Sequence, residues 1–205
     1  MINKGTIAQL PFINEFRRRR HVSKWIQAGR PIPVPHEVKQ LTILTYATGE
    51  EASVFVETGT FLGDTIWEQR HHFRQLYSIE LSRDLFEKAR RRFASVENVK
   101  LLHGDSGDEL RKVIAELKSP ALFWLDGHYS GEGTAKGQLE CPILEELRHV
   151  FGSPFQHTIL IDDARLFVGE HDYPTIAELK QFVREHGNHS IRIQNDIIVL
   201  LPHRD

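Results

Sequence analysis

The sequence predicts an α/β fold in which a doubly wound, mostly parallel sheet of seven strands carries helices on both faces. The first observation is that short apolar runs alternate with segments of helical period from residue 54 onward. The second is that these runs are apolar on both sides, as in strands that are buried on both faces. The third is that only Asn195-Asp196 separates the last two runs, which predicts a hairpin and therefore an antiparallel strand at the C-terminus.

The composition limits the classes of function. A chain of 205 residues with 40% apolar residues can bury one substantial core. Its net charge of -2 gives no general attraction to polyanions, so nucleic acid is not an expected partner. The single cysteine, Cys141, cannot form an internal disulfide. No apolar segment reaches the length of a signal peptide or a membrane span, so we expect a cytoplasmic protein without a membrane partner.

Residues 1–35 are predicted to form an N-terminal arm and a proline-rich linker ahead of a domain that spans residues 36–205. The linker, Pro31-Ile32-Pro33-Val34-Pro35, excludes a regular helix or a central strand. The basic run Arg17-Arg18-Arg19-Arg20 either grips an acidic partner or forms a solvated helix face. The second interpretation is favoured because successive helix positions point in different directions. The arm is expected to pack against a second copy of the chain or to cover its own site through Phe12, Phe16 and Trp25.

The elements of the domain follow in order. A helix is expected over 36–48, with one apolar face made of Val38, Leu41, Leu44 and Ala47. Later helices are expected from Asp64, after an N-cap at Ser82, after Ser106, over 142–151 and from Pro174. The strands between them are expected at 54–57, 75–80, 99–103, 121–125, 158–161, 191–194 and 197–201.

The first predicted strand ends at Glu57 and opens into a turn that contains Gly59 and Gly63. Glycine lets the backbone turn sharply and approach a ligand without a Cβ in the way. The helix expected from Asp64 would then present its free N–H groups, which can hold a carboxylate or a phosphate. The glycine spacing differs from the G-x-G-x-x-G pattern of dinucleotide-binding proteins. The turn therefore predicts a nucleotide-type pocket of another kind.

Each of the first five predicted strands ends in an acidic residue. In open α/β sheets, ligands bind in the crevice beyond the carboxyl ends of the strands. A single acid there is most simply a helix N-cap, but five in succession predict a rim that meets cationic or hydrogen-bond-donating partners. The acids are Glu57, Glu80, Asp105, Asp126 and the pair Asp162-Asp163.

A metal site is predicted on one side of this crevice. Asp126, Asp162 and Asp163 end two strands that are expected to be neighbours, and His128 follows closely. Oxygen ligands without cysteine suit a hard cation such as Mg²⁺ better than zinc.

These patterns resemble those of a known family. Acid-x-Gly-x-x-x-Gly after the first strand resembles motif I of the class I S-adenosylmethionine-dependent methyltransferases, whose Rossmann-like fold has the predicted layout. Together with Leu125–Tyr129 and Ile159–Asp163, it resembles the metal-dependent O-methyltransferases, and more closely the macrocin O-methyltransferase family of sugar-modifying enzymes. The resemblance covers roughly residues 50 to 200. The chain departs from it at Phe61, where many members carry a third glycine, and at His128, where the family has an acid.

The resemblance implies that S-adenosylmethionine (SAM) donates a methyl group to a hydroxyl of a small molecule, such as a sugar or a natural-product glycoside. Glu80 would then accept hydrogen bonds from the ribose hydroxyls, and Asp105 with Ser106 would lie at the adenine. The other contacts to the cofactor would come from the glycine turn, namely Glu57, Thr58, Gly59, Thr60 and Gly63.

By the same resemblance, Asp126, Asp162 and Asp163 would hold Mg²⁺, which stabilises a developing alkoxide. His128 stands where the family has its base, and it remains open whether it is a base, a metal ligand or a substrate contact. Two other functions stay open. One is a non-catalytic binding protein that keeps the methyltransferase fold. The other, less favoured, is a metal-dependent hydrolase, which leaves the glycine turn and Glu80 without a role.

Overall fold

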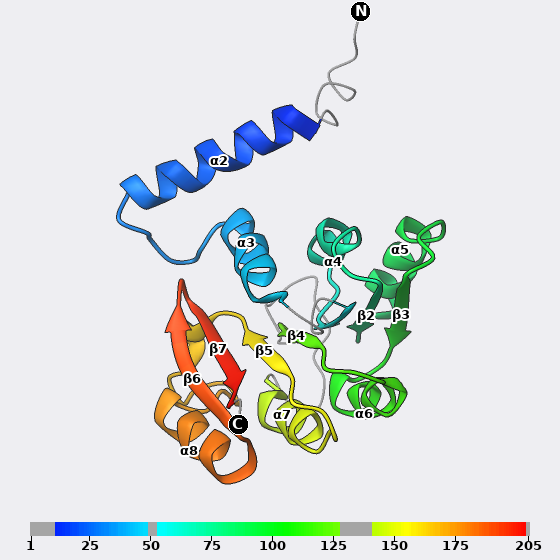
Figure 1. The fold of residues 1–205 in the computed structure, drawn as a ribbon, viewed down its shortest axis with the longest axis vertical. Helices are drawn as coiled ribbons and strands as arrows, with labels where there is room; N and C mark the ends of the chain where they lie inside the picture. Colours follow the sequence, from blue (N-terminus) through cyan, green and yellow to red (C-terminus); the bar gives the residue numbers. More distant parts are fainter. Residues whose placement is uncertain (1–10, 49–52, 128–140, 204–205) are drawn as a thin grey trace, which may run out of the picture.

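The computed structural model describes residues 11–48, 53–127 and 141–203, which form one seven-stranded sheet between two layers of helices (Figure 1). The strand order is β3-β2-β1-β4-β5-β7-β6. Strands β1 to β5 pair in parallel, whereas β7 is antiparallel to both β5 and β6. The predicted doubly wound sheet with an antiparallel strand from the C-terminal hairpin is confirmed.

The strand bounds agree with the prediction to within two residues. They are β1 (Val54–Thr58), β2 (Gln75–Glu80), β3 (Val99–His103), β4 (Leu122–Leu125), β5 (Thr158–Ile161), β6 (His189–Gln194) and β7 (Ile197–Pro202). Asn195 and Asp196 join the last two with φ values of 52° and 58°. A two-residue hairpin turn of type I′ needs a positive φ at both positions, and Asn and Asp tolerate it.

The helices cover both faces of the sheet (Figure 1). On one face lie α3 (His36–Tyr46), α4 (Asp64–Gln69) and α5 (Arg83–Arg92); on the other lie α6 (Ser106–Glu116), α7 (Ile143–Phe151) and α8 (Ile176–His186). Within β4, Trp124 packs on the side of α3, α4 and α5, and Phe123 packs on the side of α6, α7 and α8; both are almost fully buried. This two-sided burial explains why the strands are continuous apolar runs in the sequence.

The predicted apolar face of the first domain helix was wrong at Leu41, whereas Val38 of that face is buried. Leu41 is 47% exposed, and the inward face of α3 carries Ile43 and Tyr46 instead. Gln40 is fully buried because its side-chain oxygen accepts a hydrogen bond from Gln69 Nε2 in α4, at 2.6 Å. A polar residue can thus occupy a buried position of the helix, because its partner 29 positions away satisfies its side chain.

The predicted start of the last helix was also wrong, because Pro174 lies before α8. Thr175 is the N-cap, and its side chain accepts a hydrogen bond from the Glu178 N–H while the Glu178 side chain accepts one from the Thr175 N–H. This capping box satisfies two backbone donors and so fixes the helix start. The predicted N-cap at Ser82 is confirmed by a hydrogen bond from the Leu85 N–H.

Helix α2 (Pro11–Gln27) extends away from the sheet and connects to α3 (Figure 1). Trp25 joins the two elements by packing against Val34 and Val38 and by donating from Nε1 to the Pro31 carbonyl oxygen at 2.8 Å. From the basic run, Arg18 pairs with Glu68 of α4 at 3.3 Å. Contact of this arm with a second copy of the chain stays a prediction. None of the described helices is long and apolar enough to cross a membrane.

The imidazole of His157 is buried before β5 and is held as a neutral ring. Its Nδ1 accepts a hydrogen bond from the Ala121 N–H at 3.0 Å, and Nε2 lies 2.8 Å from Ser153 Oγ. Because Nδ1 is an acceptor, Nε2 carries the proton and donates to Ser153. Burial, with a smaller contribution from His189, lowers the pKa of His157 to about 4 from 6.5. The folded protein therefore resists protonation at this position.

We expect the free energy of unfolding to decrease as the pH falls from 6.5 to about 4, because the unfolded chain binds the His157 proton first. This histidine contributes at most about 3 kcal/mol to the decrease. Urea unfolding at pH 7.5 and at pH values within this window measures it. His157→Gln should reduce the pH dependence, whereas His71→Gln, at an exposed position, should leave it unchanged. An equal pH dependence in wild type and His157→Gln would contradict this account.

Candidate functional site

The candidate site lies at the carboxyl ends of the parallel strands, where the strand order reverses. β1 pairs with β2 on one side and with β4 on the other, so the chain winds outward in both directions from β1. The connections that leave β1 and β4 separate at this point, and open α/β sheets bind ligands there. The sheet topology therefore selects this rim before any side chain is considered.

The glycine turn packs directly against the end of β4. The N–H groups of Gly59 and Thr60 both donate to the Ile79 carbonyl oxygen of β2, at 3.0 and 3.2 Å. Gly59 has a φ of +80°, and a Cβ there would overlap the Asp126 carbonyl oxygen and lie 2.9 Å from its carbonyl carbon. Only glycine fits such a position without moving the backbone of β4. The turn is therefore coupled to the residue that opens the other half of the site.

The departure from the family pattern at Phe61 has a conformational consequence. Phe61 has a φ of 48°, a value that glycine adopts without strain and that other residues adopt at a cost. The residue is 49% exposed. The backbone of the turn thus keeps the shape that a glycine would give it.

Glu80 ends β2 beneath this turn and is 6% exposed. One of its oxygens accepts a hydrogen bond from the Phe61 N–H and the other from the Ser82 N–H, both at 2.8 Å. Burial raises the pKa of Glu80, and these backbone donors oppose that effect. A carboxylate offers about four lone-pair sites, so acceptor capacity remains for a hydroxyl donor from a ligand.

Asp105 and Ser106 start α6 on the next strand outward. Asp105 is the N-cap, and its Oδ1 accepts a hydrogen bond from the Gly107 N–H at 2.9 Å. Ser106 is 9% exposed, and its hydroxyl bonds to the carboxyl of Glu146 in α7. Both residues therefore have structural partners, and their contact with an adenine ring stays a prediction.

The other predicted cofactor contacts form a buried network under the turn. Ser78 Oγ donates to Glu57 at 2.5 Å and lies 2.6 Å from Thr60 Oγ1. Burial raises the pKa of Glu57 well above its usual range. Thr58 Oγ1 accepts a hydrogen bond from the Asp126 N–H at 3.2 Å. These side chains are at most 3% exposed and hold the turn in place, and their contact with the cofactor stays a prediction.

The fold brings the three predicted metal ligands together. Asp126 follows β4, and Asp162 with Asp163 follows the neighbouring β5. The Asp163 N–H donates to Asp162 Oδ1 at 2.8 Å, which orders the pair. Burial raises the pKa of Asp126 to about 7, although a lysine opposes the shift. Burial and the charge of Asp126 raise the pKa of Asp162 as well.

A lysine from α3 enters this carboxylate cluster. Lys39 Nζ donates to Asp162 Oδ2 and lies 3.5 Å from Asp163 Oδ1. Burial acts to lower the pKa of Lys39, but the three aspartates together raise it above its ordinary value. Sequence reasoning missed this residue, because Lys39 lies 123 positions from Asp162 and on a different kind of element.

Arg165 and Asp196 fix the second aspartate of the pair. Asp163 has a φ of 56° and precedes the short 3₁₀ helix Ala164–Leu166. Arg165 Nη1 donates to Asp163 Oδ1 at 2.7 Å and also contacts Asp196 in the hairpin turn. The Asp196 carbonyl oxygen accepts from the Ala164 N–H at 2.8 Å. The C-terminal hairpin therefore helps to position a residue of the site.

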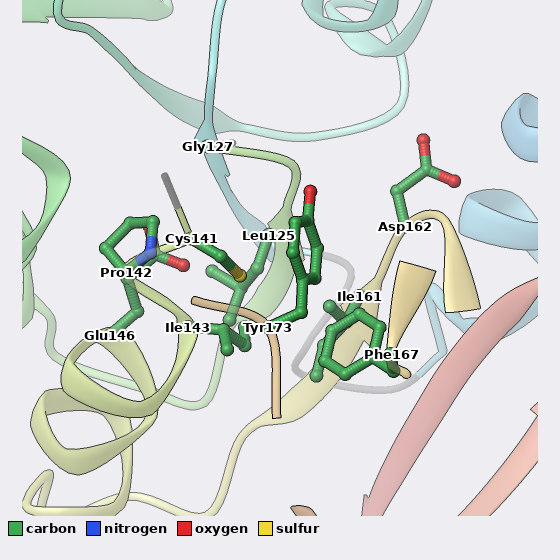
Figure 2. A pocket seen from close by; sticks show the side chains of 10 residues that line it. All are labelled: Leu125, Gly127, Cys141, Pro142, Ile143, Glu146, Ile161, Asp162, Phe167 and Tyr173. Carbon is green, nitrogen blue, oxygen red and sulfur yellow. The ribbon is translucent and has the colours of Figure 1, made fainter. Parts of the chain in front are cut away.

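A pocket opens beside the cluster between the ends of β4 and β5 and the start of α7. Figure 2 shows the Asp162 carboxylate and the Tyr173 hydroxyl directed to the same side of it. Apolar side chains make up much of its wall, and the cavity of about 10 Å³ has room for roughly one water-sized molecule as the side chains lie. The pocket is lined by Leu125, Gly127, Cys141, Pro142, Ile143, Glu146, Ile161, Asp162, Phe167 and Tyr173.

Glu146 is a second residue that sequence reasoning missed. It is 1% exposed, burial raises its pKa to about 7, and its carboxyl accepts hydrogen bonds from Ser106 and Thr58. Its Oε1 has no hydrogen-bond partner within the described part of the chain, and a Cβ on Gly127 would lie 3.0 Å from it. A signal was present, because Glu146 falls on the apolar face of α7, three residues after Ile143.

His128 lies outside the described residues, so its role stays a prediction. Within the ranges that the structure describes, no group of three or more His, Cys, Asp and Glu side chains is arranged to hold a metal ion. The three aspartates converge, but with an ammonium group among them.

Comparison with known proteins supports the fold. No protein-family model matches the chain, and no curated protein sequence does. The O-methyltransferase TomG from Streptomyces achromogenes, in complex with SAM, is 14% identical with a TM-score of 0.60 over 91% of this chain and 89% of that one. The methyltransferase PaMTH1 from Podospora anserina, bound to S-adenosylhomocysteine (SAH), is 13% identical with a TM-score of 0.60 over 100% and 98%.

An O-methyltransferase from Bacillus cereus in complex with SAH is 12% identical, with a TM-score of 0.57 over 90% of both chains. At such identities the likeness establishes the arrangement of strands and helices. The chain therefore has the class I methyltransferase fold, as the sequence predicted.

Proposed function

We propose that this chain is a SAM-dependent O-methyltransferase that acts on a hydroxyl group of a small molecule, such as a sugar. One observation carries the proposal: the Gly59 turn and the aspartates after β4 and β5 meet at the switch point of the sheet, with Gly59 against Asp126. The three similar structures hold SAM or SAH, which supports the same cofactor here.

The side of the crevice beyond β1, β2 and β3 is suited to the cofactor. Glu80 is held by two backbone donors and keeps acceptor capacity for the ribose hydroxyls. Gly59 and Gly63 let the turn pack closely against Asp126 and Phe93, and the amino-acid portion would lie over this turn. Asp105 lies one strand further out. The acidic rim also attracts a cationic sulfonium group.

The acceptor would lie on the other side of the crevice, beyond the ends of β4 and β5. In the transfer, the acceptor oxygen forms a bond to the methyl carbon, and the carbon–sulfur bond breaks with its electron pair moving to sulfur. The hydroxyl proton needs a base. Asp126, whose pKa is about 7, is poised for this role at neutral pH, and His128 is the alternative. The remaining task of the site is to place the oxygen in line with the departing sulfur.

The predicted Mg²⁺ does not fit the side chains as they lie. A divalent cation would need the carboxylate oxygens that Lys39 Nζ already contacts. We therefore assign no step to a metal ion, and the proton and the alkoxide are left to groups of the chain itself.

Isothermal titration calorimetry tests the cofactor assignment. We expect the wild-type protein to bind both SAM and SAH with a stoichiometry of one. Glu80→Gln should weaken SAM roughly 10- to 100-fold, because it replaces charged acceptors of the ribose hydroxyls. Glu97→Gln, at an exposed position before β3, is the matched control and should bind like wild type. A well-folded protein that binds neither compound would overturn the proposed function.

A further inference from the structure

The carboxylate cluster contains a cation of its own. Asp162 is 2% exposed and Asp163 is 7% exposed, so their charges need a partner inside the protein. Lys39 Nζ donates to Asp162 and lies within hydrogen-bonding distance of Asp163, while only 19% of its side chain is exposed. The ammonium group thus sits between the two carboxylates in the manner of a bound ion.

The position of Lys39 is fixed by its neighbours in α3. Val38 packs with Trp25 and Val34, and Gln40 bonds to Gln69 at 2.6 Å and to Thr65 at 3.3 Å. Residues on both sides of Lys39 are therefore anchored to different parts of the protein. A long side chain on an anchored helix loses less freedom when it pairs, so this contact is preorganised.

The nearby arginine serves a different partner. Arg165 divides its guanidinium between Asp163 and Asp196, and through Asp196 it ties the site to the hairpin turn. Its described contacts do not include Asp162. Lys39 is thus the cation that neutralises Asp162, whereas Arg165 holds Asp163 in place.

We propose that Lys39 takes the place of a divalent metal ion in this centre and presents its ammonium group to the oxygen of the acceptor. An ammonium has three N–H donors, and two of them are directed at Asp162 and Asp163. The third is left to bind the acceptor hydroxyl and to stabilise the charge that develops on its oxygen. The role at the acceptor oxygen rests on the proposed function, but the exclusion of metal does not.

Mn²⁺ is the probe for the exclusion of metal, because its binding is measured by electron paramagnetic resonance without any turnover. We expect wild type and Lys39→Arg, which both keep a cation in the cluster, to show no stoichiometric Mn²⁺ binding. Lys39→Met removes the positive charge and should bind Mn²⁺ at least about tenfold more tightly than wild type. Adding Asp162→Asn to Lys39→Met should abolish this gain, and Lys118→Met, at an exposed position, should behave like wild type.

Stoichiometric Mn²⁺ binding by wild type that Lys39→Met does not tighten would overturn the proposal. If Lys39→Met fails to fold, Mn²⁺ binding by the wild-type protein is the deciding measurement. Mn²⁺ binding by wild type that Asp162→Asn abolishes overturns the proposal, and the absence of Mn²⁺ binding by wild type supports it. Failure of SAM to bind in calorimetry would leave the Mn²⁺ result unchanged, so the two proposals fail separately. In an active preparation, chelation by EDTA should leave methyl transfer by wild type and Lys39→Arg unchanged.

Discussion

Gly59→Ala is expected to abolish measurable SAM binding and to destabilise the fold. A left-handed conformation costs a residue with a Cβ about 1–2 kcal/mol. The new Cβ would also overlap the Asp126 carbonyl oxygen, so the end of β4 must move away from the turn. That movement displaces both halves of the proposed site at once. Calorimetry with SAM and urea unfolding measure the two effects.

Gly29→Ala is the control that separates the strain of a left-handed backbone from the displacement of the end of β4. Gly29 has a φ of +84°, nearly that of Gly59, but apart from its chain neighbours no atom of the described residues lies within 4 Å of the position of its Cβ. We expect Gly29→Ala to lose a similar part of the free energy of unfolding through its left-handed conformation, and to keep wild-type affinity for SAM. Wild-type affinity in folded Gly59→Ala would show that the turn does not carry the cofactor.

Asp162→Ala is expected to reduce methyl transfer about 100- to 1000-fold, the usual effect of removing a group that stabilises a transition state. Asp162 lines the acceptor pocket and holds Lys39, whereas the glycine turn and Glu80 lie on the other side of the crevice. The affinity for SAM should therefore stay within about twofold of wild type. Transfer of labelled methyl from SAM, measured beside calorimetry, checks both statements.

Asp108→Ala, at an exposed position in the first turn of α6, is the matched control for the loss of an aspartate. It should change neither transfer nor affinity. Equal losses of transfer and of SAM affinity in Asp162→Ala would argue against a separate acceptor side.

The strands were predictable because their apolar runs end at acidic residues. β2 and β5 have the bounds expected from the sequence, since Glu80 and Asp162 close runs that are apolar on both faces. The inward face of α3 was not predictable, because Gln40 is buried by a partner in another helix. The local hydrophobic periodicity of a sequence does not indicate a side-chain pairing between two helices.

The convergence of the aspartates was predictable from topology alone. Parallel strands place their carboxyl ends on one edge, so residues after β4 and β5 must be neighbours. Lys39 enters from a helix that precedes the sheet, and Gln40 and Val38 on either side of it anchor this helix to other parts of the protein. The pattern of acids therefore indicated a cation, and the structure supplies an ammonium group of the chain itself at that place.

A crystal structure of the protein soaked with SAH tests the central claim most directly. We expect SAH in the crevice at the switch point, with its ribose hydroxyls on Glu80 and its sulfur above the Gly59 turn, facing the Asp126 side. We also expect Lys39 between Asp162 and Asp163 in the same crystal. SAH bound elsewhere on the surface, or a crevice that stays closed by side chains at saturating SAH, would contradict the account.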